Sequence, residues 1–403
     1  MAWHDVSPRL QISDPRERAL VSAADRMLDV GAAVLKPFRP RRPPVAPTRI
    51  LLLRLERIGD LLMALPAISD VRALAPDAII DLVVGSWNAD LARAMTPVSA
   101  VKVLDARWLA RGNAGLGLPS LLRAAGEWRR ERYDLGLNFE PDIRTNLLLG
   151  ASGASWTAGF ASGGGGAALD AAIAYDTRTH TTDNARRLVE AVLGHTAAPE
   201  PDITLNIPSA SHAIAAAHLA GADGPLVGVH VSGGRAIKQW PPERFAEVAR
   251  RLIGTAGATI VLTGSAADRI LIDRVAGALP QDRIVDVARD LGLLDLGAIL
   301  QRLDLLVTGD TGPMHLAAAV GTPIVAVFGP SDPARYAPSG ANDRVVRVDL
   351  PCSPCNRIRR PPARCVGHTP DCLSSISAES VFAAAMAVLD APRLQASGSA
   401  AAL

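Results

Sequence analysis

Three segments combine a strand-like apolar run, a glycine turn and a charged residue, which is how polar side chains reach the carboxyl edge of a parallel sheet. In the first, residues 52–68, Gly59 and Asp60 stand between an apolar run and a helical pattern. A carboxylate at this point can act as a general base and accept the proton of a nucleophilic hydroxyl. The alternative interpretation is an ordinary helix cap, for which Asp is also favoured.

The second segment, residues 227–245, pairs a small-residue loop with a lysine. Ser232, Gly233 and Gly234 follow the apolar run, and glycine lets backbone amides approach a ligand closely. Lys238 comes next, and it is one of only three lysines in a chain with 42 basic residues. A compact ammonium charge here indicates an anion partner. The alternative is a solvated surface lysine.

The third segment, residues 304–333, predicts an anion site at a helix N-terminus. Asp310, Thr311 and Gly312 follow a strand-like run, and Pro313 stands in the first turn of a helix that carries His315. Free amides and the helix dipole at such a turn favour negatively charged groups, and we expect the amides of Thr311, Gly312 and Met314 to face outward. The alternatives are a generic strand-to-helix turn and a buried histidine of the core.

All four cysteines fall in residues 352–372, in the pattern C-x2-C-x9-C-x6-C. Cys352, Cys355, Cys365 and Cys372 could bind zinc or iron as a tetrahedral thiolate site, so we treat them as a tentative structural metal site. Free or partly oxidised thiols and disulfides are the alternatives that remain open.

The surrounding pattern alternates short apolar runs with helical periodicity, which is typical of parallel βαβ units. Strands are expected at 50–55, 79–84, 134–139, 226–231, 258–263, 283–287, 304–307 and 323–328, with helices such as 61–74 and 118–132 between them. A chain of 403 residues exceeds the size of one domain. We therefore predict two doubly wound domains, residues 49–205 and 206–403, joined through the Pro- and Gly-containing stretch 194–224, with a site in the cleft between them.

The first 48 residues form a separate arm. A capping box at Asp14 to Glu17 predicts the start of an amphipathic helix, whose apolar positions include Leu20, Met27, Leu28, Val34 and Leu35. A Pro- and Arg-rich linker follows, and Lys36, Arg39, Arg41 and Arg42 supply its charge. The arm either packs on the body or contacts a membrane surface or partner through residues 14–42.

Composition narrows the function classes. The 42 basic and 40 acidic residues nearly balance, so no nucleic-acid partner is expected. Apolar runs are too short to cross a bilayer, and the N-terminus has no secretory signal pattern. We therefore expect a cytoplasmic protein, and the alternative is peripheral attachment to the inner face of the cytoplasmic membrane.

P-loop, HExxH and GxSxG motifs are missing from the sequence. The run Gly163–Ala168 fits a dinucleotide pattern but follows no clear strand, and we interpret it as a flexible loop.

Together, the GD after the first strand, the K-x-W-P of the second segment, DTGPMHLAAAVGTP and FGPSDP resemble glycosyltransferase family 9, the ADP-heptose lipopolysaccharide heptosyltransferases. The resemblance covers residues 49–385. It implies an α/β GT-B fold of two Rossmann-like domains facing each other across a cleft. The first domain would bind the acceptor and the second a nucleotide-diphospho-sugar.

The resemblance also implies roles for individual residues. Asp60 matches the general base, and Lys238 matches the lysine that faces the donor phosphates, so both are candidate catalytic residues. Asp310, Thr311, Gly312 and His315 match the diphosphate-binding turn, Ser232 and Gly233 belong to the donor-binding loop, and Asp268 is the candidate for the donor ribose. Related protein heptosyltransferases hold a metal in a cysteine cluster comparable to that of residues 352–372.

The expected reaction is inverting transfer of a heptose or similar sugar from ADP-heptose to the lipopolysaccharide core or another lipid-linked envelope glycan. No cofactor is expected to be required for transfer. The alternatives are a noncatalytic GT-B module that binds a sugar nucleotide or acts as a scaffold, and a nucleotide-sugar epimerase of the same fold.

Overall fold

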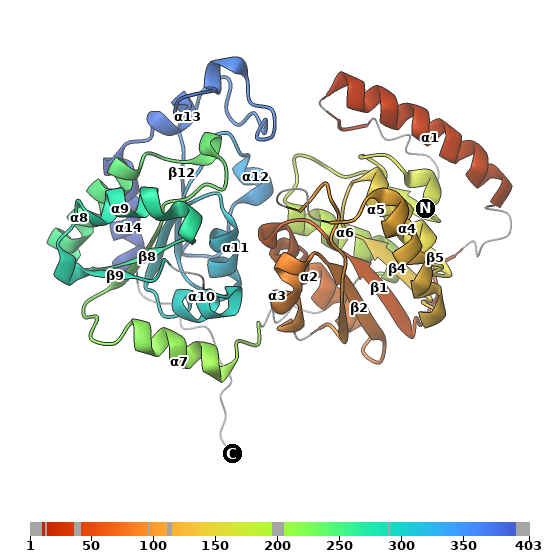
Figure 1. Cartoon of the computed structure of the whole chain (residues 1–403), viewed down its shortest axis with the longest axis horizontal. Helices are drawn as coiled ribbons and strands as arrows, with labels where there is room; N and C mark the ends of the chain where they lie inside the picture. The colour runs from red at the N-terminus through yellow and green to blue at the C-terminus, as the bar shows by residue number, and fades with distance from the viewer. Residues whose placement is uncertain are drawn as a thin grey trace. The chain divides into compact units, whose positions relative to one another are not determined.

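The computed structural model describes residues 10–12, 14–35, 42–95, 97–110, 115–195, 205–288 and 291–391. The chain divides into two compact units, Met1–Asn206 and Ile207–Leu403. Each unit contains one parallel sheet with helices packed against it, and the two are described separately (Figure 1). The α/β class predicted from the sequence is therefore confirmed.

The sheet of the first unit has six parallel strands in the order β3-β2-β1-β4-β5-β6. Their bounds are β1 (Arg49–Leu53), β2 (Ile79–Val84), β3 (Ala100–Val103), β4 (Leu135–Asn138), β5 (Trp156–Phe160) and β6 (Ala171–Ile173). In the register of the central pair, Leu53 of β1 lies opposite Asn138 of β4. The strand β1 is buried from Ile50 onward, as expected for a parallel sheet covered on both faces.

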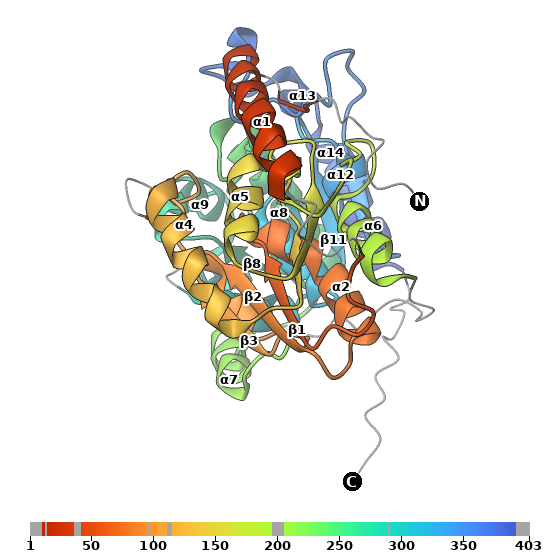
Figure 2. The ribbon, with the colours of Figure 1, turned by 90° about the vertical axis from the view of Figure 1, so that its right-hand side faces the viewer.

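Helices cover this sheet. They are α2 (Ile58–Leu74), α3 (Ala89–Arg93), α4 (Leu118–Glu127), α5 (Ile143–Ala151) and α6 (Thr181–Leu193), with short 3-10 turns at η2 (Ser86–Asn88), η3 (Trp128–Glu131) and η4 (Gly166–Ala168). The helices α2 and α6 pack together, and α4 packs against α5 (Figure 2). An ion pair of 2.7 Å between Arg186 Nε and Asp70 Oδ2 joins α6 to α2.

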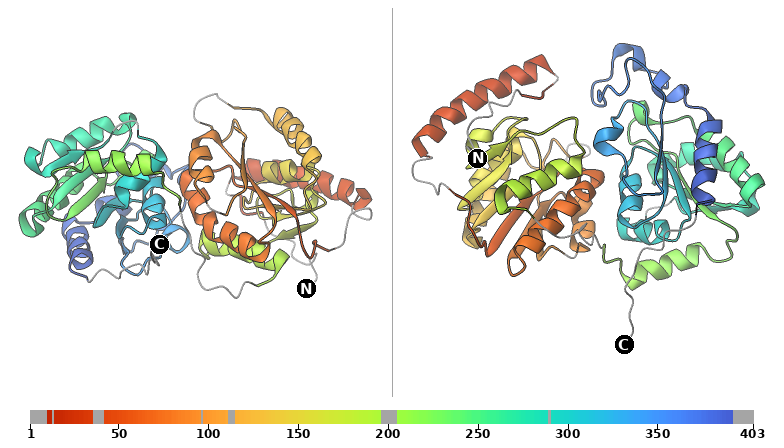
Figure 3. Two further views of the ribbon diagram at one scale, coloured as in Figure 1. Left: turned by 90° about the horizontal axis from the view of Figure 1, so that it is seen from below. Right: turned by 180° about the vertical axis from the view of Figure 1, so that it is seen from behind.

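The arm helix α1 (Pro15–Leu35) packs on the glycine-rich loop that leads into η4 (Figure 3). Asp25 Oδ1 accepts a 2.5 Å hydrogen bond from the amide of Gly165. Gly163 has no room for a side chain, because a Cβ atom there would lie 1.8 Å from the carbonyl oxygen of Pro141. The prediction that no clear strand precedes this loop is wrong. The loop follows β5, and helix α1 contacts it directly.

The second unit repeats this design with the strand order β12-β11-β10-β7-β8-β9. Its strands are β7 (Leu226–His230), β8 (Thr259–Thr263), β9 (Ile284–Asp286), β10 (Leu305–Gly309), β11 (Ile324–Val327) and β12 (Arg344–Val346). Its helices are α7 (Ser209–His218), α8 (Pro242–Ala256), α9 (Arg269–Ala276), α10 (Leu293–Leu300), α11 (Gly312–Ala319), α12 (Pro333–Tyr336), α13 (Asp371–Ser374) and α14 (Ala378–Leu389), with 3-10 turns η5 (Ala236–Lys238), η6 (Ala266–Asp268), η7 (Gln281–Arg283) and η8 (Ala363–Cys365).

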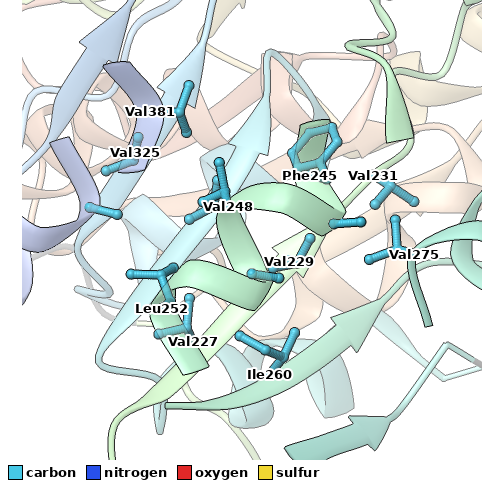
Figure 4. Packing of buried hydrophobic residues seen from close by; sticks show 14 of the residues in the cluster. Val227, Val229, Val231, Phe245, Val248, Leu252, Ile260, Val275, Val325 and Val381 are labelled. Carbon is cyan, nitrogen blue, oxygen red and sulfur yellow. The ribbon is translucent and has the colours of Figure 1, made fainter. Parts of the chain in front are cut away.

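The core of the second unit lies between its sheet and the pair α8 and α14. Alternate residues of β7, Val227 and Val229, meet Val248 and Leu252 from α8 (Figure 4). Residues two apart in a strand, such as Val227 and Val229, point to the same face of the sheet. Residues four apart in a helix, such as Val248 and Leu252, likewise share one face of the helix. This buried layer fixes β7, and so fixes where the chain leaves the strand.

Candidate active site

Both sheets reverse their strand order at a central pair of strands, β1 with β4 in the first unit and β7 with β10 in the second. Ligands of doubly wound sheets bind outside the carboxyl ends of the strands at this switch point. Asp60 follows β1, Lys238 follows β7, and Asp310 follows β10 directly. The polar residues selected from the sequence thus stand beside the two switch points.

Asp60 lies in the first turn of α2 and has a role in capping that helix. Its Oδ2 atom accepts a 3.2 Å hydrogen bond from the amide of Arg57, the N-cap residue. The helix N-terminus favours the negative charge. The Asp60 side chain keeps 27% of its surface exposed, so a ligand can still reach the carboxylate. Capping and general-base chemistry are therefore compatible in this residue.

Arg54 holds Asp60 from the end of β1. Its guanidinium Nε donates to the carbonyl oxygen of Asp60 at 3.0 Å, and Nη2 lies 3.5 Å from the carboxylate Oδ1. A further bond of 2.7 Å runs from Nη1 to the carbonyl oxygen of Phe139, beyond β4. Only 3% of the Arg54 side chain is exposed. Neighbouring carboxylates outweigh the effect of burial and raise the pKa of Arg54, so its charge is retained.

Glu140 makes the reverse connection, from β4 back to β1. It is buried, and its Oε1 accepts hydrogen bonds from the amides of Leu55 and Glu56. Burial and the nearby charge of Glu56 raise the pKa of Glu140 to about 8, although Arg54 opposes the shift. The fold therefore favours the neutral form of Glu140.

Sequence reasoning missed Arg54 and Glu140. Both are charged residues placed at the end of a buried run, Arg54 after residues 50–53 and Glu140 after residues 134–139. Since adjacent parallel strands end at one edge, charges that follow two such strands are expected to meet there. This signal identifies the two residues only once β1 and β4 are known to be neighbours.

In the second unit, Lys238 pairs with Asp310 across the switch point. Lys238 Nζ lies 2.6 Å from Asp310 Oδ2, and both side chains are largely buried. His315 Nε2 lies 4.0 Å from the other oxygen of the same carboxylate. Burial alone would raise the pKa of Asp310, but Lys238 and His315 hold it below its usual range. The group is thus a fixed carboxylate that orients a cation at the carboxyl edge.

The turn after β10 opens helix α11 at the same place. Thr311 is the N-cap, and its Oγ1 accepts a 3.4 Å hydrogen bond from the amide of Met314. The expectation that the Met314 amide faces outward is therefore wrong, because the cap uses it. The start of α11 at Gly312 still provides the positive end of a helix dipole for an anion.

The loop after β7 packs tightly over the lysine. A Cβ atom on Gly233 would lie 2.7 Å from the carbonyl carbon of Lys238, so only glycine fits. Ser232 is buried and accepts a 3.3 Å hydrogen bond from the amide of Gly234. The loop thereby fixes the backbone from which Lys238 projects.

Asp268 lies in η6 after β8, and its carboxylate caps that turn. Its Oδ2 accepts from Ser265 through the amide at 3.0 Å and the hydroxyl at 2.7 Å. Burial opposes ionisation, but these bonds, together with one from Ser232 and the nearby His230, lower the pKa of Asp268. The structure thus brings Ser232 and Asp268 together.

His230, the last residue of β7, was not selected from the sequence. Its Nδ1 lies 3.1 Å from Thr263 Oγ1, and burial lowers its pKa to about 4 despite the charge of Asp268. The imidazole is therefore neutral at physiological pH and hydrogen-bonds to the end of β8, beside the loop that follows β7.

The four cysteines are free thiols in the structure. Burial, with the neighbouring thiols of Cys355, Cys365 and Cys352, raises the pKa of Cys372 to about 11. Within the described part of the chain, no group of three or more His, Cys, Asp or Glu side chains is arranged to hold a metal ion.

Comparison with known proteins gives this geometry a context. Residues 122–363 match glycosyltransferase family 9 (heptosyltransferase). Lipopolysaccharide heptosyltransferase 1 of Pseudomonas aeruginosa is 27% identical over 322 residues, which cover 76% of this chain and 86% of that protein.

Two solved structures share the fold. A family 9 glycosyltransferase from Veillonella parvula aligns with a TM-score of 0.72 at 26% identity, covering 85% of this chain and 97% of that one. The ADP-heptose lps heptosyltransferase II of E. coli aligns with a TM-score of 0.68 at 21% identity, covering 85% and 98%. The fold is therefore GT-B, with two Rossmann-like units. The family match spans more than half of the chain and includes both Lys238 and the turn at residues 310–315, so this chain belongs to glycosyltransferase family 9.

Proposed function

We propose that this glycosyltransferase transfers heptose from ADP-heptose to the lipopolysaccharide core. The observation that carries the proposal is the pair of charged groups beside the switch points, a reachable carboxylate in the first unit and a held cation at a helix N-terminus in the second. A glycosyl transfer needs a proton acceptor and a means to stabilise a departing diphosphate. The similarity to heptosyltransferase 1 of P. aeruginosa and heptosyltransferase II of E. coli supports heptose as the sugar.

In the proposed reaction, Asp60 accepts the proton of an acceptor hydroxyl as its oxygen bonds to the anomeric carbon of heptose. The bond from that carbon to the diphosphate oxygen breaks, ADP leaves with the electron pair, and the configuration inverts. Lys238 and the N-terminus of α11 stabilise the charge that builds on the leaving diphosphate. Asp310 holds Lys238, and His315 lies beside the same carboxylate, while Ser232, Gly233 and Asp268 shape the nucleotide side.

The test is release of ADP and formation of a glycosylated product from ADP-heptose and a heptose-free core acceptor. Asp60→Asn should bind ADP as the parent does and slow transfer by about 10²–10⁴-fold, the usual effect of losing a general base. Near-normal transfer by Asp60→Asn would reject the base. ADP-heptose consumption without acceptor would favour epimerisation, and binding without turnover would favour a noncatalytic module.

We also propose that α1 contacts the membrane that carries the acceptor. Among the described residues, no helix is long and apolar enough to span a bilayer, so this would be surface contact. Away from the glycine-rich loop, α1 exposes Leu20 (73%), Met27 (78%) and Val30 (71%). Arg42 is exposed nearby in the sequence, whereas Lys36, Arg39 and Arg41 lie outside the described residues, as do the side chains of Val34 and Leu35. Apolar anchors with basic neighbours favour anionic lipid surfaces.

We further propose that Cys352, Cys355, Cys365 and Cys372 hold a structural zinc or iron ion. Support comes from the chemistry of the donor set, four cysteines within residues 352–372, because thiolates are ligands that zinc and iron favour. The thiols would have to converge further than they do here, because they form no ligand group in the described structure. Elemental analysis of protein purified under reducing conditions tests this, and substoichiometric zinc and iron would reject it.

A further inference from the structure

A buried arginine is costly unless its charge and its donors are satisfied, so the place of Arg54 calls for a physical reason. It stands one residue beyond the end of β1, whose residue pairing with β4 ends at Leu53. All three guanidinium nitrogens have partners there. Those partners are Asp60, the carbonyl oxygen of Phe139 and, at 3.4 Å from Nη1, the carboxylate of Glu56.

Arg54 and Glu140 form two crossed connections beyond the sheet. Arg54 donates from the β1 side to the main chain after β4, and Glu140 accepts on the β4 side from the main chain after β1. Together they fix the segment between β1 and α2, which has no strand ladder of its own. The first turn of α2, and Asp60 with it, is thereby attached to two strands.

We propose that Arg54 is a positioning residue for Asp60, which holds both the main chain and the carboxylate of the base at the switch point. The inference rests on the proposed role of Asp60 as the base. Arg54 contacts Asp60 through two atoms of one planar group, the carbonyl oxygen through Nε and the carboxylate oxygen through Nη2. Such a fork restricts the direction of the carboxylate as well as its place, which an ammonium group would not do.

The test separates positioning from folding. Arg54→Met should lower kcat by about 10–10²-fold, the effect expected when a catalytic group is displaced by about 1 Å. The affinity for ADP, measured by calorimetry, should stay unchanged, since the proposed nucleotide site lies in the second unit. Arg54→Lys should recover part of kcat.

Arg72→Met is the matched control. Arg72 stands in the last turn of the same helix and also donates to backbone carbonyls, those of Pro76 and Ala78 at 2.8 Å and of Pro97 at 3.1 Å. Arg72→Met should reduce the free energy of unfolding to a similar extent as Arg54→Met but leave kcat unchanged. Equal losses of kcat in the two variants would overturn the proposal and leave Arg54 as a packing residue.

A double-mutant cycle distinguishes failure of this inference from failure of the proposed base. In the Asp60→Asn background, Arg54→Met should cost little more than twofold, because its effect passes through a base already removed. If Arg54→Met lowers kcat in this background as much as it does in the parent, Arg54 does not act through Asp60, although Asp60 can still be the base. If Asp60→Asn alone is nearly normal, the proposed function fails first. Should Arg54→Met not fold, the same cycle is run with Arg54→Lys.

Discussion

At the scale of single residues, Lys238 performs two tasks that must be separated experimentally. It satisfies buried Asp310 at 2.6 Å and, in the proposed reaction, stabilises the leaving diphosphate. Removing one member of a largely buried pair leaves the other without its partner, which is destabilising. Any loss of activity in a Lys238 variant therefore needs a stability measurement beside it.

Lys238→Ala is expected to weaken ADP binding and to lower kcat further, because more charge meets the cation in the transition state than in the ground state. Lys238→Arg should recover only part of the ADP affinity and of kcat, since a planar guanidinium group replaces the point charge of an ammonium group. Calorimetry with ADP measures the first effect. Lys102→Ala is the control, because Lys102 also pairs with a carboxylate, Asp81 at 3.5 Å, but lies on β3. If Lys238→Ala binds ADP as tightly as the parent does, Lys238 does not contact the phosphates.

Glu140 gives stability a defined dependence on pH. Its pKa is about 8 in the folded chain against an ordinary value of 4.5, so between these values the folded state retains a proton that the unfolded state releases. Unfolding free energy should therefore fall as pH rises from 4.5 to 8. Beside Arg54, the charged groups that act on Glu140 are Glu56 and Asp142.

Glu140→Gln keeps an oxygen for the amides of Leu55 and Glu56 but cannot ionise. Relative to the parent, the variant should gain stability with rising pH, by on the order of a few kcal/mol at pH 9. Urea unfolding at several pH values measures the difference. Glu127→Gln, on the exposed end of α4, should show no such trend. If the unfolding free energies of Glu140→Gln and of the parent change with pH in parallel, the pKa of Glu140 is not raised in the folded chain.

At the scale of elements, α1 illustrates a segment with two different faces. Its inner face meets the glycine-rich loop, where a Cβ on Gly164 would lie 2.4 Å from Val21 Cγ1 and Asp25 binds the amide of Gly165. Removing the whole helix would expose that loop, so a deletion would confuse packing with membrane contact. Point changes on the outer face avoid the problem.

Replacing Leu20, Met27 and Val30 by Ser should release the protein from anionic liposomes while leaving transfer to a soluble acceptor analogue unchanged. These three side chains are at least 71% exposed, so the fold has little to lose. Co-sedimentation at low salt measures binding. Ile270→Ser, on α9 with 78% exposure, is the control. If the parent does not sediment, or the triple variant sediments equally well, α1 is only a packing element.

Element prediction succeeded where apolar runs were long and failed where small residues made the strand. β2 has the bounds expected from the sequence, residues 79–84, because six consecutive residues carry the pattern. β5 and β6, with sequences WTAGF and AAI, were missed since Ala and Gly give no periodic signal. β3 and β12 were also missed, because strands of four and three residues are too short to show a pattern. The same weak signal explains why no strand was expected before the glycine-rich loop.

For the site, sequence patterns placed Asp60, Lys238 and Asp310 after the strands they follow, because a turn after a buried run is a local signal. The partners could not be found in this way. Arg54 and Glu140 are 86 residues apart in the sequence, and Ser232 and Asp268 meet only because β7 and β8 are neighbours. Contacts of this kind depend on strand order, which no local pattern contains. The roles assigned to these residues remain predictions.

At the scale of the whole molecule, the repeated strand order gives each unit one switch point with its own electrostatic character. The first presents a carboxylate beside a buried guanidinium, and the second presents an ammonium beside a helix N-terminus. A proton acceptor and an anion binder on separate units are the two components that transfer between an acceptor and a nucleotide-diphospho-sugar requires. Neither component uses a divalent cation in the proposed chemistry, because Lys238 and α11 supply positive charge directly.

Transfer by the full chain is therefore expected to persist in EDTA. The Cys segment complicates this test, since a structural ion bound at residues 352–372 would also respond to chelation, but through stability. The two effects differ in how fast they appear after chelation and in which metal restores activity. A catalytic magnesium would leave at once and be restored by magnesium alone, whereas loss of a thiolate-bound ion would lower the melting temperature and be restored by zinc or iron. Activity that vanishes on chelation, returns with magnesium and leaves the melting temperature unchanged would contradict charge stabilisation by Lys238 and α11.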